Sequence, residues 1–358
     1  MTSKFISPSL PLIYDLDLFE LEELLNKLGE PAFRAKQIWQ GLYQQLWNSP
    51  DQFTSLPKPL RDHLAESFRF SAFIPERTMQ SSDGQTEKIL FRLPDQFAIE
   101  TVLMKYETRR TLCISSQSGC AMGCVFCATG QMGFKRNLSS GEIVEQVLYY
   151  ARTLKSVNEK VTNIVVMGMG EPFHNYKEVL KAIDRLNHPD GMNLGERRFT
   201  ISTVGLVPGI RKFTAEKRQI NLAISLHAAN NDLRSSLVPV NSRYPLEDLM
   251  AACRDYVHTT RRRITFEWAL IQDVNDTPAH AQQLVKLVKG LLCHVNIIAL
   301  NPTRKYSGKS TTQNRARAFK DILDRAGIPC TIRLRRGIDI QAGCGQLATE
   351  TGMNQDPD

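Results

Sequence analysis

At 358 residues, with 42% hydrophobic and 23% charged residues, the chain has the composition of a globular protein with one large and one small core. No stretch approaches the roughly twenty apolar residues of a membrane span, and the acidic residues 1–20 do not resemble a signal peptide, so we expect a cytoplasmic protein without membrane partners. The net charge of +8 gathers in basic clusters, which indicate either a polyanionic partner such as RNA or DNA or a solvated basic surface. These clusters are Arg109-Arg110, Lys135-Arg136, Arg197-Arg198, Arg261-Arg262-Arg263 and Arg333-Leu334-Arg335-Arg336.

Residues 1–100 are mostly helical in pattern, and we interpret them as a small domain with a strand linker. An amphipathic helix is expected within residues 30–43, and a second amphipathic segment over residues 60–68 follows a Pro-rich break. The apolar face of the first helix would comprise Phe33, Ile38, Trp39 and Leu42. Strands at 88–93 and 99–105 are expected to pair across a Pro-Asp turn.

From residue 101 to residue 347, short β-branched runs alternate with helical segments. Strands are expected at 111–115, 163–167, 199–203, 222–225, 264–270, 295–300 and 330–334. Helices are expected between most of them, at 141–154, 177–186, 246–257, 279–288 and 315–326. This alternation predicts an α/β fold with about six parallel β/α units in a partial barrel, whose active residues follow the carboxyl ends of the strands. Residues 348–358 read as a polar tail.

Four of the eight cysteines fall within fifteen residues, which indicates a metal site in a reducing compartment. Cys120, Cys124 and Cys127 form a C-x3-C-x2-C motif. A 4Fe-4S cluster that only transfers electrons has four thiolate ligands, so three leave one iron open to bind and cleave S-adenosylmethionine (SAM). Zinc is the alternative, but it prefers a second cysteine pair that the sequence lacks. The spacing, with Phe126 before the last cysteine, resembles the radical SAM superfamily.

Polar residues that follow the predicted strands could bind SAM. Gly170 would allow close approach of the backbone, and Glu171 could pair with the SAM ammonium group. Neutral hydrogen-bonding groups at later strand ends are offered by Ser202, by Ser225-Leu226-His227 and by Asn301. A tight turn at Gly170 and a structural role for His227 are the alternatives from the residues alone.

Several further segments carry a more specific resemblance: Cys113-Ile-Ser-Ser-Gln-Ser-Gly-Cys120, Gly133-Phe-Lys-Arg136, Gly168-Met-Gly-Glu-Pro172, Ile201-Ser-Thr203, Leu300-Asn-Pro302 and Gly343-Cys-Gly-Gln-Leu347. Together they resemble the RlmN/Cfr family of radical SAM RNA adenine methyltransferases, from about Phe33 to Leu347. The N-terminal part is similar to the RlmN branch, in which a small helical domain helps to hold RNA. Val204 departs from the Ser that this branch often has.

The resemblance implies a reaction at C2 of an adenosine in 23S rRNA and in tRNA. One SAM would methylate Cys344, a radical from a second SAM would activate that methyl group for bonding to adenine C2, and Cys113 would release the product by forming a transient disulfide. Glu100 is similar to the residue assigned as proton acceptor. The resemblance also implies an electron donor, such as flavodoxin or ferredoxin, and a disulfide reductant.

Two alternatives remain from the sequence. A Cfr-like enzyme would methylate adenine C8 with the same cysteines. A noncatalytic iron-sulfur protein that binds RNA or senses redox state would hold a closed four-ligand cluster and would not cleave SAM.

Overall fold

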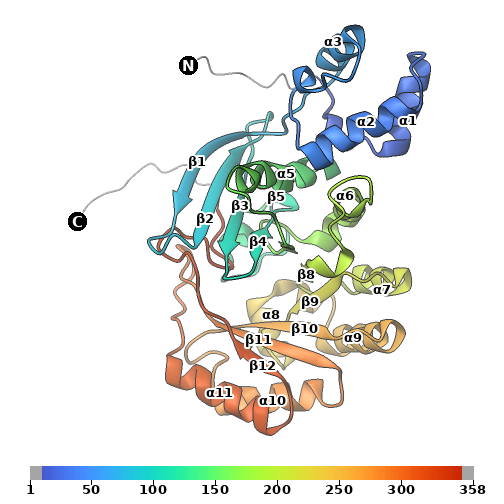
Figure 1. The fold of residues 1–358 in the computed structure, drawn as a ribbon. Helices are drawn as coiled ribbons and strands as arrows, with labels where there is room; N and C mark the ends of the chain where they lie inside the picture. Colours follow the sequence, from blue (N-terminus) through green and yellow to red (C-terminus); the bar gives the residue numbers. More distant parts are fainter. Residues whose placement is uncertain (1–9, 349–358) are drawn as a thin grey trace.

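A computed structural model describes residues 10–348, and one ten-stranded sheet runs through it in the order β1-β2-β3-β4-β7-β8-β9-β10-β11-β12 (Figure 1). The strands from β4 onward pair in parallel, whereas β1 to β4 pair in antiparallel fashion. They are β1 (Ile74–Gln80), β2 (Thr86–Arg92), β3 (Ala98–Lys105), β4 (Arg110–Cys113), β7 (Asn163–Val166), β8 (Phe199–Thr203), β9 (Asn221–Ser225), β10 (Ile264–Leu270), β11 (Cys293–Ala299) and β12 (Cys330–Ile332). A separate hairpin joins β5 (Gln117–Gly119) and β6 (Phe134–Asn137).

Helices that connect the parallel strands line one side of the curved sheet (Figure 1). They are α5 (Ser140–Ser156), α6 (Tyr176–Asn187), α7 (Val207–Glu216), α9 (Leu246–Thr260), α10 (Pro278–Val288) and α11 (Gln313–Arg325). Each helix buries an apolar stripe against strands whose side chains on that face are also buried. The predicted partial (β/α)6 barrel is confirmed, and the strand expected at 330–334 is β12, which pairs with β11.

The first helix of the barrel, α5, shows why these elements begin where they do. Ser139 and Glu142 form a capping box, in which the Glu142 N–H donates to the Ser139 hydroxyl at 3.2 Å and the Ser139 N–H donates to the Glu142 carboxylate at 3.0 Å. These bonds satisfy amide groups that would otherwise lack partners at the helix start.

The N-terminal helices α1 (Leu18–Lys27), α2 (Phe33–Gln40) and α3 (Lys58–Ser67) pack at one end of the barrel, near α5 and α6 (Figure 1). The connection is specific, because the Asp15 carboxylate accepts a hydrogen bond from the Gly141 N–H at 2.7 Å. A Cβ at Gly141 would lie 2.8 Å from the Asp15 amide nitrogen, so the contact requires glycine. The Asp15 carbonyl also accepts from Arg185 at 2.5 Å.

Helix α2 differs from the expectation in one respect. Ile38, Trp39 and Leu42 are buried as predicted, but Phe33 is 57% exposed and carries the guanidinium of Arg34 over its ring. Phe33 is the first residue of the helix, whereas the ring of Trp39, further along it, packs against His188 after α6. The predicted apolar face was therefore wrong at this position.

The boundary expected between residues 100 and 101 falls inside β3, which pairs with both β2 and β4. Of the expected tail, only Ala348 belongs to the described residues. Within residues 10–348, no helix has the length and apolar character that a membrane span requires.

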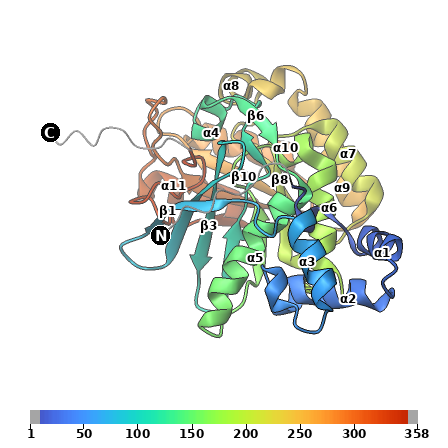
Figure 2. The ribbon, with the colours of Figure 1, turned by 90° about the horizontal axis from the view of Figure 1, so that it is seen from above.

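Loops at the carboxyl ends of the parallel strands carry the remaining small elements. The β5–β6 hairpin and α4 (Ala128–Gln131) follow β4, and α8 (Asn231–Leu237) follows β9. Figure 2 shows α4, β6 and α8 on one side of the molecule, with α2 and α3 on the opposite side. The predicted functional residues lie mainly on these loops, as expected for parallel β/α units.

Candidate active site

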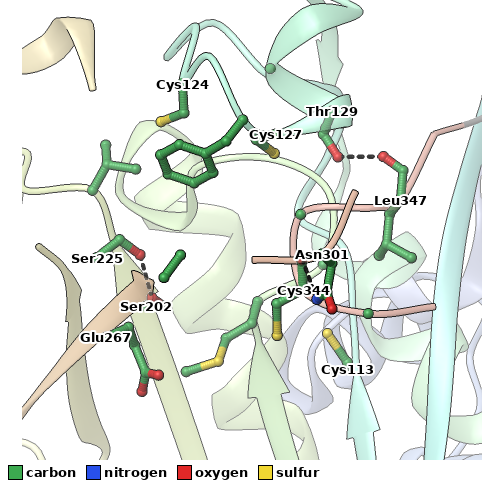
Figure 3. Close-up of a pocket in the computed structure, with 18 of the residues that line it drawn as sticks. Cys113, Cys124, Cys127, Thr129, Ser202, Ser225, Glu267, Asn301, Cys344 and Leu347 are labelled. Carbon is green, nitrogen blue, oxygen red and sulfur yellow. Dashed lines mark hydrogen bonds between the residues drawn. The ribbon is translucent and has the colours of Figure 1, made fainter. Parts of the chain in front are cut away.

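Cys120, Cys124 and Cys127 lie on the loop between β5 and α4, and all three line one pocket. Backbone hydrogen bonds fix the loop at both ends: the Cys120 N–H donates to the carbonyl of Gly133 at 3.1 Å, and the amide after Cys127 donates to the carbonyl of Gly345 at 2.7 Å. The second bond joins this loop to the one that carries Cys344 (Figure 3).

The donor set of this loop fits an iron-sulfur cluster. Burial raises the pKa of the Cys124 thiol, and the thiols of Cys127 and Cys120 raise it further; burial also raises the pKa of Cys120 to about 12. Thiols whose pKa values are raised in this way ionise readily only beside a strongly positive partner such as bound iron. Within residues 10–348, no three His, Cys, Asp or Glu side chains converge as a single metal ion requires. A 4Fe-4S cluster instead places each thiolate on a different iron, so the geometry disfavours the zinc alternative.

Two glycines bring the segment after β7 against the loop after β4. A Cβ at Gly168 would lie 2.7 Å from the Ile114 carbonyl oxygen. Gly170 has a φ of +103°, and a Cβ there would lie 2.6 Å from the side chain of Gln117. Both positions therefore require glycine, as the sequence suggested for Gly170.

Glu171 lines the same pocket and is buried. One carboxylate oxygen accepts from the Phe173 N–H at 3.0 Å, and the other accepts from the Val204 N–H at 2.9 Å. Burial raises the pKa of Glu171 to about 7. Because a carboxylate oxygen can accept a second hydrogen bond, Glu171 can hold the loop at Val204 and also face an ammonium group.

The strand-end residues Ser202 and Ser225 lie side by side on β8 and β9, with their hydroxyl oxygens 3.4 Å apart (Figure 3). His227 follows with a φ of +60°, and its Nδ1 accepts from the Ala269 N–H at 3.0 Å. Burial lowers the pKa of His227 to about 3, so the ring is neutral and carries its proton on Nε2. Ser202, Ser225 and His227 line the pocket, whereas Leu226 is fully buried beside it.

Asn301 connects the pocket to the loop of Cys344. Its side-chain amide donates to the Cys344 carbonyl at 3.0 Å, while its Oδ1 is buried and has no hydrogen-bond partner among the described residues. A buried acceptor without a partner is rare in proteins and points to a missing ligand donor. The sites of Asn301, Ser202 and Ser225 thus fit a polar cofactor such as SAM.

Cys344 and Cys113 meet in this pocket although 230 residues separate them in the sequence. Cys113 ends β4, and Cys344 is exposed on the loop after β12. Burial raises the pKa of Cys113 to about 12, and the thiol of Cys344 adds to the increase. Figure 3 shows the two side chains next to each other.

Glu100 lies on β3 but does not line the pocket in the described part of the chain. Its carboxylate forms a buried ion pair with Lys88, at 2.9 Å, and accepts from the Ala348 N–H at 2.9 Å. Lys88 also donates to the Gln341 carbonyl at 3.1 Å. Burial raises the pKa of Glu100, and Lys88 opposes this increase. The pair contacts the Cys344 loop on both sides of the cysteine.

The sequence analysis missed two charged residues that line the pocket, Glu267 on β10 and Arg333 after β12. The available signal for Glu267 was a single charged residue in a mostly apolar strand, in which its neighbours Phe266 and Trp268 are buried. Arg333 was noted only as part of a basic cluster.

One arginine in each of three other basic clusters is engaged within the protein. Arg110 forms an ion pair with Glu159 at 2.5 Å, and Arg136 pairs with Glu142 at 2.8 Å. Arg262 donates to Asn221 at 2.8 Å and lies two residues before the start of β10, so it is at the opposite end of that strand from the pocket. These contacts favour a structural role for those arginines.

Comparison with known proteins agrees with this site. Residues 114–284 match the family model described as radical SAM superfamily, and residues 13–69 match that described as ribosomal RNA large subunit methyltransferase N-terminal domain. A radical SAM methyltransferase from Sphaerobacter thermophilus has a similar crystal structure, with a TM-score of 0.93 and 51% identity over 95% of this chain and all of that one.

Curated relatives match over nearly their whole length. A probable dual-specificity RNA methyltransferase RlmN of Chloroflexus aurantiacus is 50% identical over 94% of this chain and 92% of its own. A protein with the same name from Geobacillus kaustophilus is 48% identical over 95% and 93%. With both domain models and these relatives in agreement, the chain belongs to the RlmN family of radical SAM methyltransferases, whose superfamily uses a 4Fe-4S cluster and SAM.

Proposed function

We propose that this protein methylates C2 of a specific adenosine in 23S rRNA and in tRNA, with Cys344 as carrier of the methyl group. The observation that carries the proposal is the meeting of Cys344 and Cys113 in the pocket that the three clustered cysteines line. The names of the relatives support RNA as substrate and a dual specificity.

Cys120, Cys124 and Cys127 would hold the cluster. SAM would be bound by Gly170, Glu171, Ser202, Ser225, Leu226, His227 and Asn301. When bound, the reduced cluster and SAM supply a radical that abstracts a hydrogen atom. The contribution of the protein is orientation: Glu171 faces the ammonium group, the neutral His227 ring donates from Nε2, and Asn301 Oδ1 accepts the hydrogen bond that it lacks here.

Adenine C2 is not nucleophilic, so it cannot attack a SAM methyl group directly. A methyl group on Cys344 avoids this limit, because its carbon bonds to C2 after losing a hydrogen atom. The adduct must then lose one electron, which the oxidised cluster would accept, and the C2 proton. The RNA is then attached to the Cys344 sulfur. Attack by the Cys113 thiolate on that sulfur forms the Cys113–Cys344 disulfide as the carbon-sulfur bond breaks. The electron pair of that bond goes to the carbon on the base, which takes up a proton to become the methyl group, and the methylated base leaves.

Glu100 is the proposed acceptor of the C2 proton. A carboxylate whose pKa is raised by burial is a better base than one in water, which supports this assignment. Its ion pair with Lys88 and its bond to Ala348 also hold the loop of Cys344, so loop movement would be needed to bring Glu100 to the base.

The reaction also requires partners. A flavodoxin or ferredoxin would donate electrons to the cluster, and a thiol reductant would reopen the disulfide in each cycle. We propose that the helices of residues 13–69 help to hold the RNA, and that the enzyme works in the cytoplasm, where its RNA substrates are.

The proposed function is tested by anaerobic reconstitution with iron, sulfide, SAM, reductant and RNA. The expected products are 5′-deoxyadenosine and 2-methyladenosine, identified by mass spectrometry of the nucleosides. Formation of 8-methyladenosine instead would show that C8, and not C2, is the target. A closed cluster without 5′-deoxyadenosine would favour the noncatalytic alternative.

Replacing Cys113 with Ala is expected to stop the enzyme after less than one turnover, with the RNA bonded to Cys344. The cluster, methylation of Cys344 and SAM cleavage should all persist, because none needs the Cys113 thiol. Denaturing electrophoresis with and without ribonuclease, followed by mass spectrometry of the Cys344 peptide, detects the adduct.

Cys253→Ala is the matched control, since Cys253 is a buried thiol of α9 that does not line the pocket in the described residues. It should turn over normally, with a modest loss of stability from a small cavity. If Cys113→Ala behaved in the same way and released methylated RNA, Cys113 would be a core residue and not the resolving thiol.

A further inference from the structure

Glu267 and Asn296 form a polar row on the pocket side of the sheet. Glu267 on β10 lies in register with Ser225 on β9 and with Asn296 on β11. The Asn296 side-chain amide donates to Oε1 of Glu267 at 2.9 Å. Figure 3 shows Glu267 on the strand side of the pocket, near Ser202 and Ser225. The reaction described above uses neither Glu267 nor Asn296.

Arg333 completes the row from the next segment of the chain. Its backbone N–H donates to the Ile297 carbonyl at 2.8 Å, which fixes its position beside β11. The guanidinium Nη1 lies 3.9 Å from Oε2 of Glu267. Since both side chains line the pocket, it presents a carboxylate and a guanidinium together.

This pair retains hydrogen-bonding capacity for a ligand. A separation of 3.9 Å is longer than a hydrogen bond, so the two charges attract each other without a hydrogen bond between them. The N–H groups of Arg333 and Oε2 of Glu267 therefore remain available to a ligand. In the part of the chain that the structure describes, Oε2 of Glu267 accepts no hydrogen bond. The guanidinium of Arg333 carries five N–H donors.

The pair also lies where the target base must come. The charges of Arg333 and of Glu267 both act on the thiol of Cys344, and Arg333 also acts on that of Cys113. A base bonded to the Cys344 methyl carbon must lie against Cys344, and therefore within reach of these charges.

Adenine has two edges that place a donor next to an acceptor. The Watson–Crick edge offers the N6 amino group beside N1, and the Hoogsteen edge offers N6 beside N7. N1 is bonded to C2, whereas N7 is bonded to C8. The edge that the protein holds near Cys344 therefore determines which carbon the methyl group reaches.

We propose that Glu267 and Arg333 read the Watson–Crick edge of the target adenine: Oε2 of Glu267 accepts from the N6 amino group, and the Arg333 guanidinium donates to N1. The proposal rests on the proposed function and deepens it. Arg333 then holds C2 beside Cys344, which gives the C2 product, and an N–H donated to N1 withdraws electron density from the carbon under attack. Asn296 acts as a positioning residue by fixing the carboxylate of Glu267.

The test pairs protein variants with altered bases. The substrate is a tRNA that the wild type methylates, with adenosine or purine riboside, which lacks the amino group, at the target position. Wild-type kcat/KM should fall about tenfold to a hundredfold on purine riboside, the effect of losing one hydrogen bond to a charged group. On adenosine, Glu267→Ala should lower kcat/KM by a similar factor. On purine riboside it should lower kcat/KM little further, because the amino group that Glu267 binds is already absent. Glu267→Gln, which keeps an acceptor, should recover much of the discrimination.

Arg333 is tested with deaza bases in the same way. 1-Deazaadenosine lacks N1, and 7-deazaadenosine lacks N7. Only 1-deazaadenosine should therefore reduce the difference in kcat/KM between wild type and Arg333→Ala. Asp255→Ala, an exposed carboxylate on α9, is the control and should behave as wild type with every RNA.

The opposite result is equally clear. If Glu267→Ala slowed adenosine and purine riboside RNA equally and excess SAM restored the rate, the pair would belong to the SAM site and the proposal would be wrong. If only 7-deazaadenosine reduced the difference in kcat/KM between wild type and Arg333→Ala, the protein would read the Hoogsteen edge, and the proposal would also be wrong. Failure of the wild type to methylate any RNA, despite forming 5′-deoxyadenosine, would instead refute the proposed function.

Discussion

Replacing Cys124 with Ala is expected to abolish SAM cleavage, with 5′-deoxyadenosine falling to background and the iron content of the reconstituted protein dropping sharply. The thiol of Cys124 is buried beside those of Cys120 and Cys127, and no other cysteine in residues 10–348 lines this part of the pocket except Cys113 and Cys344. Three thiolates hold three irons of the cluster and leave one open. With only two thiolates left, the cluster is no longer held firmly in the protein. Iron analysis, visible absorbance and an assay for 5′-deoxyadenosine measure the effect.

The control is Cys293→Ala, because Cys293 is a buried cysteine at the start of β11 whose thiol pKa burial raises to about 11. It should retain iron and full SAM cleavage. A Cys124→Ala protein with wild-type iron content and turnover would show that the cluster assignment is incorrect.

Cys344→Ala is expected to lose RNA methylation completely while the cluster and SAM cleavage remain. The three cluster cysteines and the polar groups at Ser202, Ser225 and Asn301 are unchanged, so the radical can still form. No methyl carrier is left to bond to adenine, however. Mass spectrometry should find one added methyl group on the Cys344 peptide of the wild type and none on the variant.

A second variant separates the thiol from the shape of the loop. Cys344→Ser keeps a side chain of similar size and the hydrogen bond from Asn301 to the backbone carbonyl at position 344, so it should preserve the loop yet also lose methylation. Normal methylation by either variant, or a methyl group found on a different residue, would rule out Cys344 as the carrier.

Strands and helices of the barrel could be predicted from the sequence because their patterns are local. The strands at 199–203 and 264–270 were predicted with the observed bounds, and the remaining barrel strands within two residues at each end. Buried parallel strands are short apolar runs, and their connecting helices show an apolar stripe of helical period.

Strand β1 was missed for the converse reason. It lies at the edge of the sheet, contains Pro75, and is exposed over most of its length, so it has no alternation of apolar and polar residues. Its pairing with β2 alone makes it a strand. Edge strands of this kind depend on a neighbour and carry little signal of their own.

The sequence by itself determined the chemistry. Three cysteines lie at cluster spacing because a metal-binding loop needs its ligands close along the chain, and the other motifs of a radical SAM methyltransferase are also contiguous segments. Only the tertiary structure decided which distant residues meet. It brings Cys113 on β4 to Cys344 after β12, and it buries Glu100 against Lys88. It also places Arg333 beside Glu267. The distance between them is set by strand register and loop position, and no local sequence pattern records either.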